Sequence, residues 1–223
     1  MPGFHSEWIA CPSLSSSRRE PSGICTTRAY GHYFPDTRID AVDIDGKLFE
    51  IGRRYFGLES RPQLHEFAQD ARPFLRRTGE RYDSIFVDAY RQPYIPFYLA
   101  TQEFFALTRE RLRPGGSVIV NVGHPRGSDT LENALAATMG RVFNYVARNR
   151  IVATNTMLIG SDARISRATM VSASLPSDLV PVARDQDVEP APLGGEVFTD
   201  DRAPVEWLID TSIVRYAAGE GSG

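Results

Sequence analysis

Short apolar segments with an aspartate at or near their carboxyl end recur along the chain, and they alternate with stretches of helical spacing. Residues 39–44 carry Asp43 near their carboxyl end, and residues 82–88 end in Asp88. A third aspartate, Asp70, comes just after the weaker apolar segment 64–67. Apolar runs that alternate with helical segments indicate βαβ units and a mainly parallel sheet. The sequence therefore predicts an α/β fold.

Regular alternation of expected elements begins at about residue 24. Thr101 is the expected N-cap of one helix, which Pro114-Gly115-Gly116 ends. A Pro-rich, acidic stretch covers residues 174–195. We expect helices over 26–34, 46–56, 71–77, 101–112, 128–141 and 203–216, and strands over 39–44, 64–67, 82–88, 117–122, 142–148 and 153–160.

Chain length and composition favour one domain with a sizeable core, since the chain has 223 residues of which 42% are hydrophobic. Residues 1–23 are rich in proline and serine and show no helical or strand period, so we expect a poorly ordered leader. Residues 24–218 are expected to form the α/β domain, and residues 219–223 a flexible tail.

Several classes of protein are excluded by the same composition. No apolar run reaches the 18 or so residues that a membrane span needs, and the first 25 residues contain no signal-peptide core. Cys11 and Cys25 stand in no metal-binding spacing, which excludes a disulfide scaffold or a cysteine zinc site. The net charge of −3 does not suggest nucleic-acid binding. We therefore expect a cytoplasmic protein without a cysteine zinc site.

Asp43, Asp70 and Asp88 are the candidate ligand-binding residues. In open parallel sheets, ligands bind beyond the carboxyl ends of the strands, where all three are expected. A carboxylate at the end of the second strand of such a sheet can accept hydrogen bonds from both hydroxyls of a ribose. The alternative is that each aspartate only caps the helix that follows it. The residues alone leave both interpretations open.

A set of motifs across residues 26–216 is more specific. The motifs are YFPDTRIDAVDID at 33–45, YFG at 55–57, QDARPFL at 69–75, YDSIFVDAY at 82–90, TQEFF at 101–105, LRPGG at 112–116 and TDDRAPVE at 199–206. Together they resemble the spermidine synthase family of polyamine aminopropyltransferases. The last motif is similar to the ending of the bacterial spermidine synthase-like branch.

This resemblance implies a Rossmann-like parallel sheet of the S-adenosylmethionine-dependent methyltransferase type, with helices on both faces. It implies a transferase of polyamine biosynthesis that moves an aminopropyl group from decarboxylated S-adenosylmethionine to an amine, without a metal. By motif position, Asp43 and Ile44 would hold the ribose, Asp70 and Ala71 would face the adenine, and Asp88 would be the catalytic residue beside the sulfonium and the amine.

The chain departs from the family pattern before Thr26. Residues 22–25 occupy the position of the family's glycine-rich loop, and only Gly23, 20 residues before Asp43, remains as a candidate cofactor-binding glycine. The polar leader replaces the usual strand, and the family's small N-terminal β-domain is absent. We therefore expect an N-terminally truncated relative.

A second departure falls in the loop after Asp88, where Tyr90, Arg91 and Tyr94 are expected to line the acceptor pocket. Arg91 stands where the family has its second carboxylate. A guanidinium within ~4 Å of a substrate ammonium is repulsive by several kcal/mol at an effective dielectric near 20. Arg91 therefore fits an anionic acceptor, or no catalysis, better than it fits a polyamine.

Three functions stay open at this stage. The first is aminopropyl transfer, with activity impaired by Arg91. The second is methyl transfer from S-adenosylmethionine, since the same sheet binds either donor. The third is a non-catalytic nucleoside-binding module. The expected partners are a small-molecule amine or other acceptor, with a homodimer as the candidate assembly and neither nucleic acid nor a direct membrane span.

Overall fold

A single eight-stranded sheet organises the protein, with the strand order β3-β2-β1-β4-β5-β7-β6-β8. The structure is a computed structural model, and it describes residues 5–7, 22–88, 95–171 and 175–218. The strands are β1 (His5–Glu7), β2 (Arg38–Asp43), β3 (Leu64–Ala68), β4 (Tyr82–Val87), β5 (Leu112–Gly123), β6 (Tyr145–Val152), β7 (Asn155–Ser161) and β8 (Val188–Pro190).

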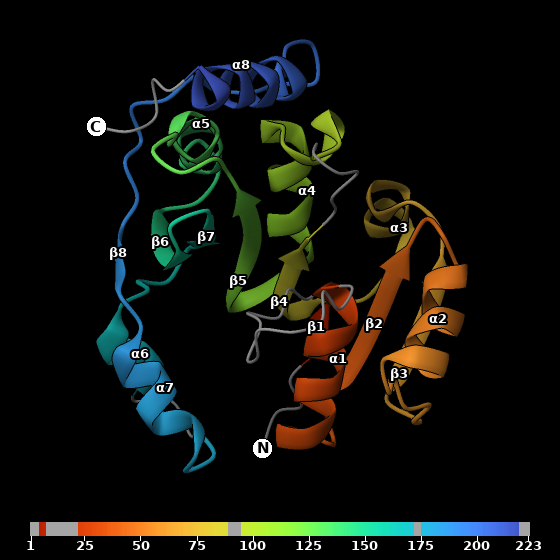
Figure 1. The fold of residues 1–223 in the computed structure, drawn as a ribbon. Helices are drawn as coiled ribbons and strands as arrows, with labels where there is room; N and C mark the ends of the chain where they lie inside the picture. The colour runs from red at the N-terminus through yellow and green to blue at the C-terminus, as the bar shows by residue number, and fades with distance from the viewer. Residues whose placement is uncertain (1–4, 8–21, 89–94, 172–174, 219–223) are drawn as a thin grey trace.

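Strands β3, β2, β1, β4 and β5 are parallel, and their carboxyl ends lie at one edge of the sheet (Figure 1). Strands β7, β6 and β8 extend the sheet from β5 in antiparallel fashion. The predicted α/β class and mainly parallel sheet are thus confirmed, and the antiparallel part is confined to one end.

Eight α-helices and one 3₁₀ helix accompany the sheet among the described residues. They are α1 (Ser22–Tyr33), α2 (Lys47–Tyr55), α3 (Ala71–Arg77), η1 (Phe97–Leu99), α4 (Gln102–Arg111), α5 (Thr130–Met139), α6 (Arg167–Val171), α7 (Leu179–Asp185) and α8 (Val205–Ala217). The predicted bounds of α3 agree with the structure. Thr101 caps α4 as predicted, because its side chain accepts a hydrogen bond from the Phe104 backbone N–H.

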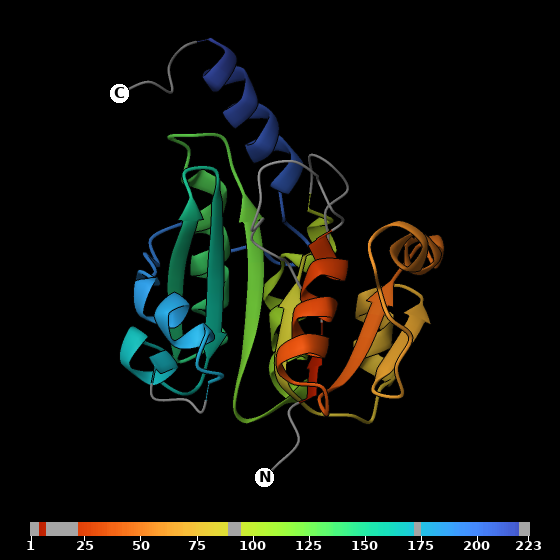
Figure 2. The same cartoon turned by 60° about the horizontal axis from the view of Figure 1, so that its bottom comes forward.

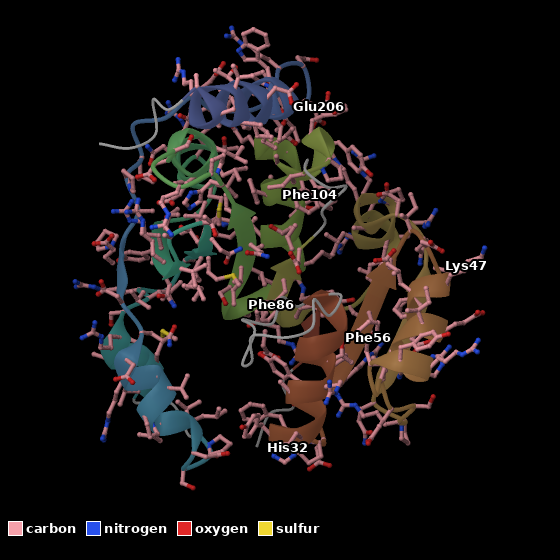
Figure 3. All side chains as sticks on the ribbon, in the orientation of Figure 1. His32, Lys47, Phe56, Phe86, Phe104 and Glu206 are labelled. Carbon is pink, nitrogen blue, oxygen red and sulfur yellow. The ribbon has the colours of Figure 1, made fainter. Side chains whose placement is uncertain are left out.

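Helices cover both faces of the sheet, as Figure 2 shows for α1 in front of it and α5 behind it. Alternate residues of β4 point to opposite faces, as in any strand. Phe86 meets the ring of Tyr30 from α1 edge-on, at 6.2 Å between centroids, while Ile85 faces the main core. Phe104 of α4 is 1% exposed and belongs to that core (Figure 3). The helices on the two faces thus bury the central strands.

The expectation of a leader without regular structure over residues 1–23 is wrong for His5–Glu7. These residues form β1, which lies between β2 and β4 and is parallel to both. A three-residue polar strand is too short to show an alternating pattern, and its pairing partners are 33 and more residues away in the chain. The central position in the sheet, rather than local sequence, accounts for this strand.

The expected loop at Ser22–Cys25 is also wrong, because these residues form the first turn of α1. Gly23 therefore lies in a helix and not in a glycine-rich loop. The chain between β1 and α1 lies outside the described residues. The Pro-rich stretch 174–195 contains two elements that the sequence did not predict, the short helix α7 and the edge strand β8. Pro114-Gly115-Gly116 lies within β5, at its irregular start beside β4.

Among the described residues, no helix has the length and the apolar character needed to cross a bilayer.

Candidate functional site

The strand registers place Asp43 and Asp88 at the same height on the sheet. Ile39 of β2 is paired with Ser6 of β1, and Ser6 is also paired with Ser84 of β4. Asp43 follows Ile39 by four residues, and Asp88 follows Ser84 by four residues. One strand separates β2 from β4, so the backbones of the two aspartates lie two strand spacings apart, or ~10 Å.

Asp70 lies beside Asp43 on the other side. Asp43 is paired with Ala68 of β3, and the Gln69 backbone N–H donates to the Asp43 carbonyl at 2.9 Å. Asp70 is the next residue after Gln69. The structure therefore brings the three predicted aspartates to one edge of the sheet, at the ends of β3, β2 and β4.

The Asp43 carboxylate is half-buried, and its Oδ1 accepts a 2.8 Å hydrogen bond from the Asp45 backbone N–H. Burial raises the pKa of Asp43 above its ordinary value of 3.8, and the negative charge of Asp45 adds to the rise. The hydrogen bond from the Asp45 backbone lowers the pKa, but by less than burial raises it. Ile44, next to it, is 66% exposed. A carboxylate and an exposed apolar side chain thus stand together at the end of β2.

Gly46 allows the chain to turn back closely from β2 into α2. A Cβ at this position would lie 2.9 Å from the Cβ of Ala68 in β3. That distance is shorter than real Cβ contacts, so a side chain at Gly46 would displace the start of α2. The glycine therefore keeps α2 against the end of β3, beside Asp43.

Both carboxylate oxygens of Asp70 accept hydrogen bonds. Oδ1 accepts from the Arg72 backbone N–H at 2.9 Å, which makes Asp70 the N-cap of α3. Oδ2 accepts from the Tyr98 hydroxyl at 2.8 Å. Each oxygen of a carboxylate can accept a second bond, so the side chain is oriented and still able to bind a donor. Ala71, half-buried, is the first residue of α3.

The Asp88 carboxylate is fixed by two asparagines that the sequence did not single out. Asn121 of β5 donates from Nδ2 to Asp88 Oδ1 at 2.8 Å, and Asn155 of β7 donates to Asn121 Oδ1 at 2.5 Å. A carboxylate only accepts, so this chain of bonds sets the orientation of both amides. A polar residue near the end of the most apolar strand, β5, is the one signal that marks Asn121 in the sequence.

The capping interpretation is confirmed for Asp70. Asp43 accepts from the turn before α2, and Asp88 accepts from Asn121 of a neighbouring strand. Tyr90, Arg91 and Tyr94 lie outside the described residues, so their predicted place at the acceptor pocket stays a prediction. Within the described part of the chain, no three His, Cys, Asp or Glu side chains gather in a way that could hold a metal ion.

Comparisons with known proteins find similarity to one family. The spermine/spermidine synthase domain matches residues 26–170. A probable polyamine aminopropyl transferase of Bifidobacterium longum is 29% identical over 246 aligned positions, which cover 97% of this chain and 55% of the relative. The chain thus spans about half the length of this relative.

Solved structures show the same fold. A probable spermidine synthase from Corynebacterium glutamicum superposes with a TM-score of 0.68 at 19% identity, over 89% of this chain and 72% of the other. Human methyltransferase-like protein 13, in complex with SAH, has a TM-score of 0.60 at 18% identity, over 82% of this chain and 79% of the other. The expected methyltransferase-type sheet is therefore confirmed.

Proposed function

Because the chain belongs to the spermine/spermidine synthase family, we propose that it transfers an aminopropyl group from decarboxylated S-adenosylmethionine to an amine. The observation that carries the proposal is the row of three aspartates at the carboxyl edge of the sheet, with Asp43 and Asp88 level and ~10 Å apart. This edge is where open parallel sheets bind nucleotides and nucleosides.

Asp43, Ile44, Asp70 and Ala71 would bind the adenosyl group. The Asp43 carboxylate offers paired acceptors for the two ribose hydroxyls, and exposed Ile44 offers an apolar surface beside them. The Asp70 carboxylate, held on both oxygens, would accept from the exocyclic amine of adenine. No described residue is needed as a metal ligand, because a sulfonium is already an activated leaving group.

Asp88 would serve the reacting centre, with its position supported by the bond from Asn121. The acceptor amine must be neutral to attack, while a free alkylamine has a pKa of about 10.4. A nearby carboxylate can bind the ammonium and take or relay its proton. The amine nitrogen then forms a bond to the propyl carbon next to sulfur. The carbon–sulfur bond breaks with its electron pair left on sulfur, which releases methylthioadenosine.

Arg91 shapes the choice of acceptor in this proposal. By sequence offset it replaces a carboxylate that would attract a cationic amine, and a guanidinium pairs well with carboxylates. The acceptor class that suits it is an amine that also carries a carboxylate. Binding of the nucleoside without turnover is the second candidate function, and Arg91 is the observation that favours it.

A thermal-unfolding titration with methylthioadenosine tests the nucleoside site. At a hundred times its dissociation constant, a ligand adds about 2.7 kcal/mol to stability, or about 5–10 °C for a chain of this size. Asp43→Ala should abolish the shift. Asp36→Ala, which replaces an exposed carboxylate just before the start of β2, should leave the thermal shift unchanged. No shift with wild-type protein would refute the proposal.

A further inference from the structure

A tight turn near the C-terminus, beyond the region that matches the family domain, lies against the candidate site. Thr199 and Arg202 exchange two backbone hydrogen bonds of 3.0 Å, which places Asp200 and Asp201 at the tip of the turn. Phe198, fully buried, anchors the turn, and its carbonyl accepts from the Gln102 backbone N–H at 2.9 Å. The turn is thus tied to the start of α4.

Asp200 reaches from this turn to α3. Its carboxylate forms a two-pronged pair with Arg72, at 2.8 Å from Nη1 to Oδ1 and 2.5 Å from Nη2 to Oδ2. The Thr101 hydroxyl also donates to Asp200 Oδ1, at 2.7 Å. Arg72 is only 8% exposed, and a buried guanidinium needs such partners because its desolvation is costly. Asp200 therefore fixes where the Arg72 guanidinium lies.

Arg72 in turn fixes the segment that carries Tyr98. Its Nη1 donates to the Tyr98 carbonyl at 3.0 Å, and the Tyr98 hydroxyl donates to Asp70 Oδ2 at 2.8 Å. The backbone N–H of Arg72 donates to the other oxygen of Asp70. Two bonds from different elements define the plane of the Asp70 carboxylate, and the one from Tyr98 comes from a segment that the Arg72 guanidinium holds.

We propose that Asp200 is a positioning residue of the donor site: through Arg72 and Tyr98 it orients Asp70 toward the exocyclic amine of the adenine. The inference rests on the proposed function, since it takes Asp70 as the residue that recognises adenine. It makes the C-terminal turn a part of the nucleoside site, although the turn itself would touch no ligand.

If Asp200 only stabilised the fold, its replacement would have a different effect on nucleoside binding. The selectivity between two nucleosides distinguishes the two roles. Methylthioinosine carries an oxygen acceptor where methylthioadenosine carries the amine donor, so only the adenine compound can use an oriented Asp70. A loss of general stability would weaken the binding of both nucleosides alike. A loss of orientation would weaken the binding of methylthioadenosine alone.

The experiment measures the dissociation constants of both nucleosides by calorimetry for wild type, Asp200→Asn, Tyr98→Phe and the double variant. Asp201→Asn, an exposed carboxylate of the same turn, is the matched control. We expect Asp200→Asn and Tyr98→Phe each to weaken methylthioadenosine binding roughly tenfold, with methylthioinosine binding unchanged. The double variant should lose little more than either single variant, because both act through Asp70.

Two results would overturn the inference in distinguishable ways. If wild type prefers methylthioadenosine and Asp200→Asn keeps that preference in full, Asp200 does not orient Asp70, while the proposed function stands. If wild type binds neither nucleoside, the proposed function fails and this inference fails with it. Tyr98→Phe removes one hydroxyl from a half-buried side chain, so it tests the link from Tyr98 to Asp70 even if Asp200→Asn does not fold. If Tyr98→Phe keeps the preference in full, that link is absent and the inference is overturned.

Discussion

Asn121 Nδ2 lies 2.8 Å from Asp88 Oδ1, and this bond joins the end of β4 to the neighbouring strand β5. Asn155, diagonally across on β7, donates a hydrogen bond to Asn121 Oδ1 and so orients the Asn121 amide. The catalytic carboxylate of the proposed mechanism is thus oriented by side chains from two strands of the sheet.

Replacing Asn121 should therefore affect turnover more than donor binding. We expect Asn121→Ala to lower kcat for methylthioadenosine release about tenfold, because Asp88 loses its orienting donor. The KM for the donor should change less than about twofold, since Asn121 is proposed to act through Asp88 alone. Steady-state kinetics on purified protein measures both. Asn144→Ala, at an exposed position before β6, is the control, and a wild-type kcat in Asn121→Ala would contradict the role.

The sequence predicted those parts of the fold that local patterns encode. The bounds of α3 and the N-cap at Thr101 follow from side chains that bond to backbone groups a few residues away. For Asp70, capping is one of the two interpretations that the residues alone leave open. The position of the three aspartates follows from the rule that parallel strands share one carboxyl edge. These features depend on short-range chemistry or on topology, and both can be read from one sequence.

Long-range contacts account for what the sequence could not predict. Strand β1 has three polar residues and is held by pairing on both sides, and β8 is a three-residue edge strand in a Pro-rich stretch. The bonds of Asp88 to Asn121 and of Arg72 to Asp200 join residues 33 and 128 positions apart. No periodicity or spacing marks such pairs, so the residues that orient the aspartates emerge only from the structure.

The pH dependence of nucleoside binding should report on Asp43. Burial raises the pKa of this carboxyl above 3.8, and ribose hydroxyls are held by its ionised form. Affinity for methylthioadenosine should therefore fall as the pH is lowered through the raised pKa, at a higher pH than an ordinary aspartate would give. Binding should also release a proton in that range. Calorimetry at several pH values in two buffers of different ionisation enthalpy measures both effects.

Asp43→Asn provides the control for that titration. Asp43→Asn should bind methylthioadenosine more weakly than wild type does. Its affinity should not fall as the pH is lowered through the same range. If the variant shows the same fall as wild type, another group titrates, and Asp43 does not hold the ribose in its ionised form.

The pair between Arg72 and Asp200 should contribute to stability in a pH-dependent way. The hydrogen bonds from Arg72 lower the pKa of Asp200 below 3.8. A lowered pKa means that the stabilisation is fully present above the unfolded value near 3.8 and is lost as the pH falls through the folded value. Because Asp200 is 42% exposed, we expect Asp200→Asn to cost only about 1–2 kcal/mol at pH 7.

Urea unfolding of wild type and Asp200→Asn at pH 7 and at several acidic pH values measures this contribution. The difference in the free energy of unfolding should shrink below pH 3.8. Asp201→Asn should differ little from wild type at any pH. A difference for Asp200→Asn that stays constant down to the acid transition would contradict the charge-based account of the pair.

Arg91 is expected to control the acceptor. Because its charge repels a cationic amine, wild type should turn over putrescine slowly or not at all. Arg91→Asp should raise putrescine-dependent release of methylthioadenosine, with nucleoside binding unchanged. Arg126→Asp, an exposed arginine of another loop, should not. Turnover of putrescine by wild type at about 1 per second or faster, a rate typical of enzymes, would show that Arg91 does not oppose the amine.

The most direct test of the proposed function is the reaction itself. Wild type and Asp88→Asn are incubated with decarboxylated S-adenosylmethionine and each of a series of amines, with and without a carboxylate group, and the products are identified by mass spectrometry. We expect wild type to form equal amounts of methylthioadenosine and an aminopropylated amine, most rapidly with a carboxylate-bearing acceptor. Asp88→Asn should form neither at a comparable rate. Binding of methylthioadenosine by wild type without product from any amine would contradict aminopropyl transfer.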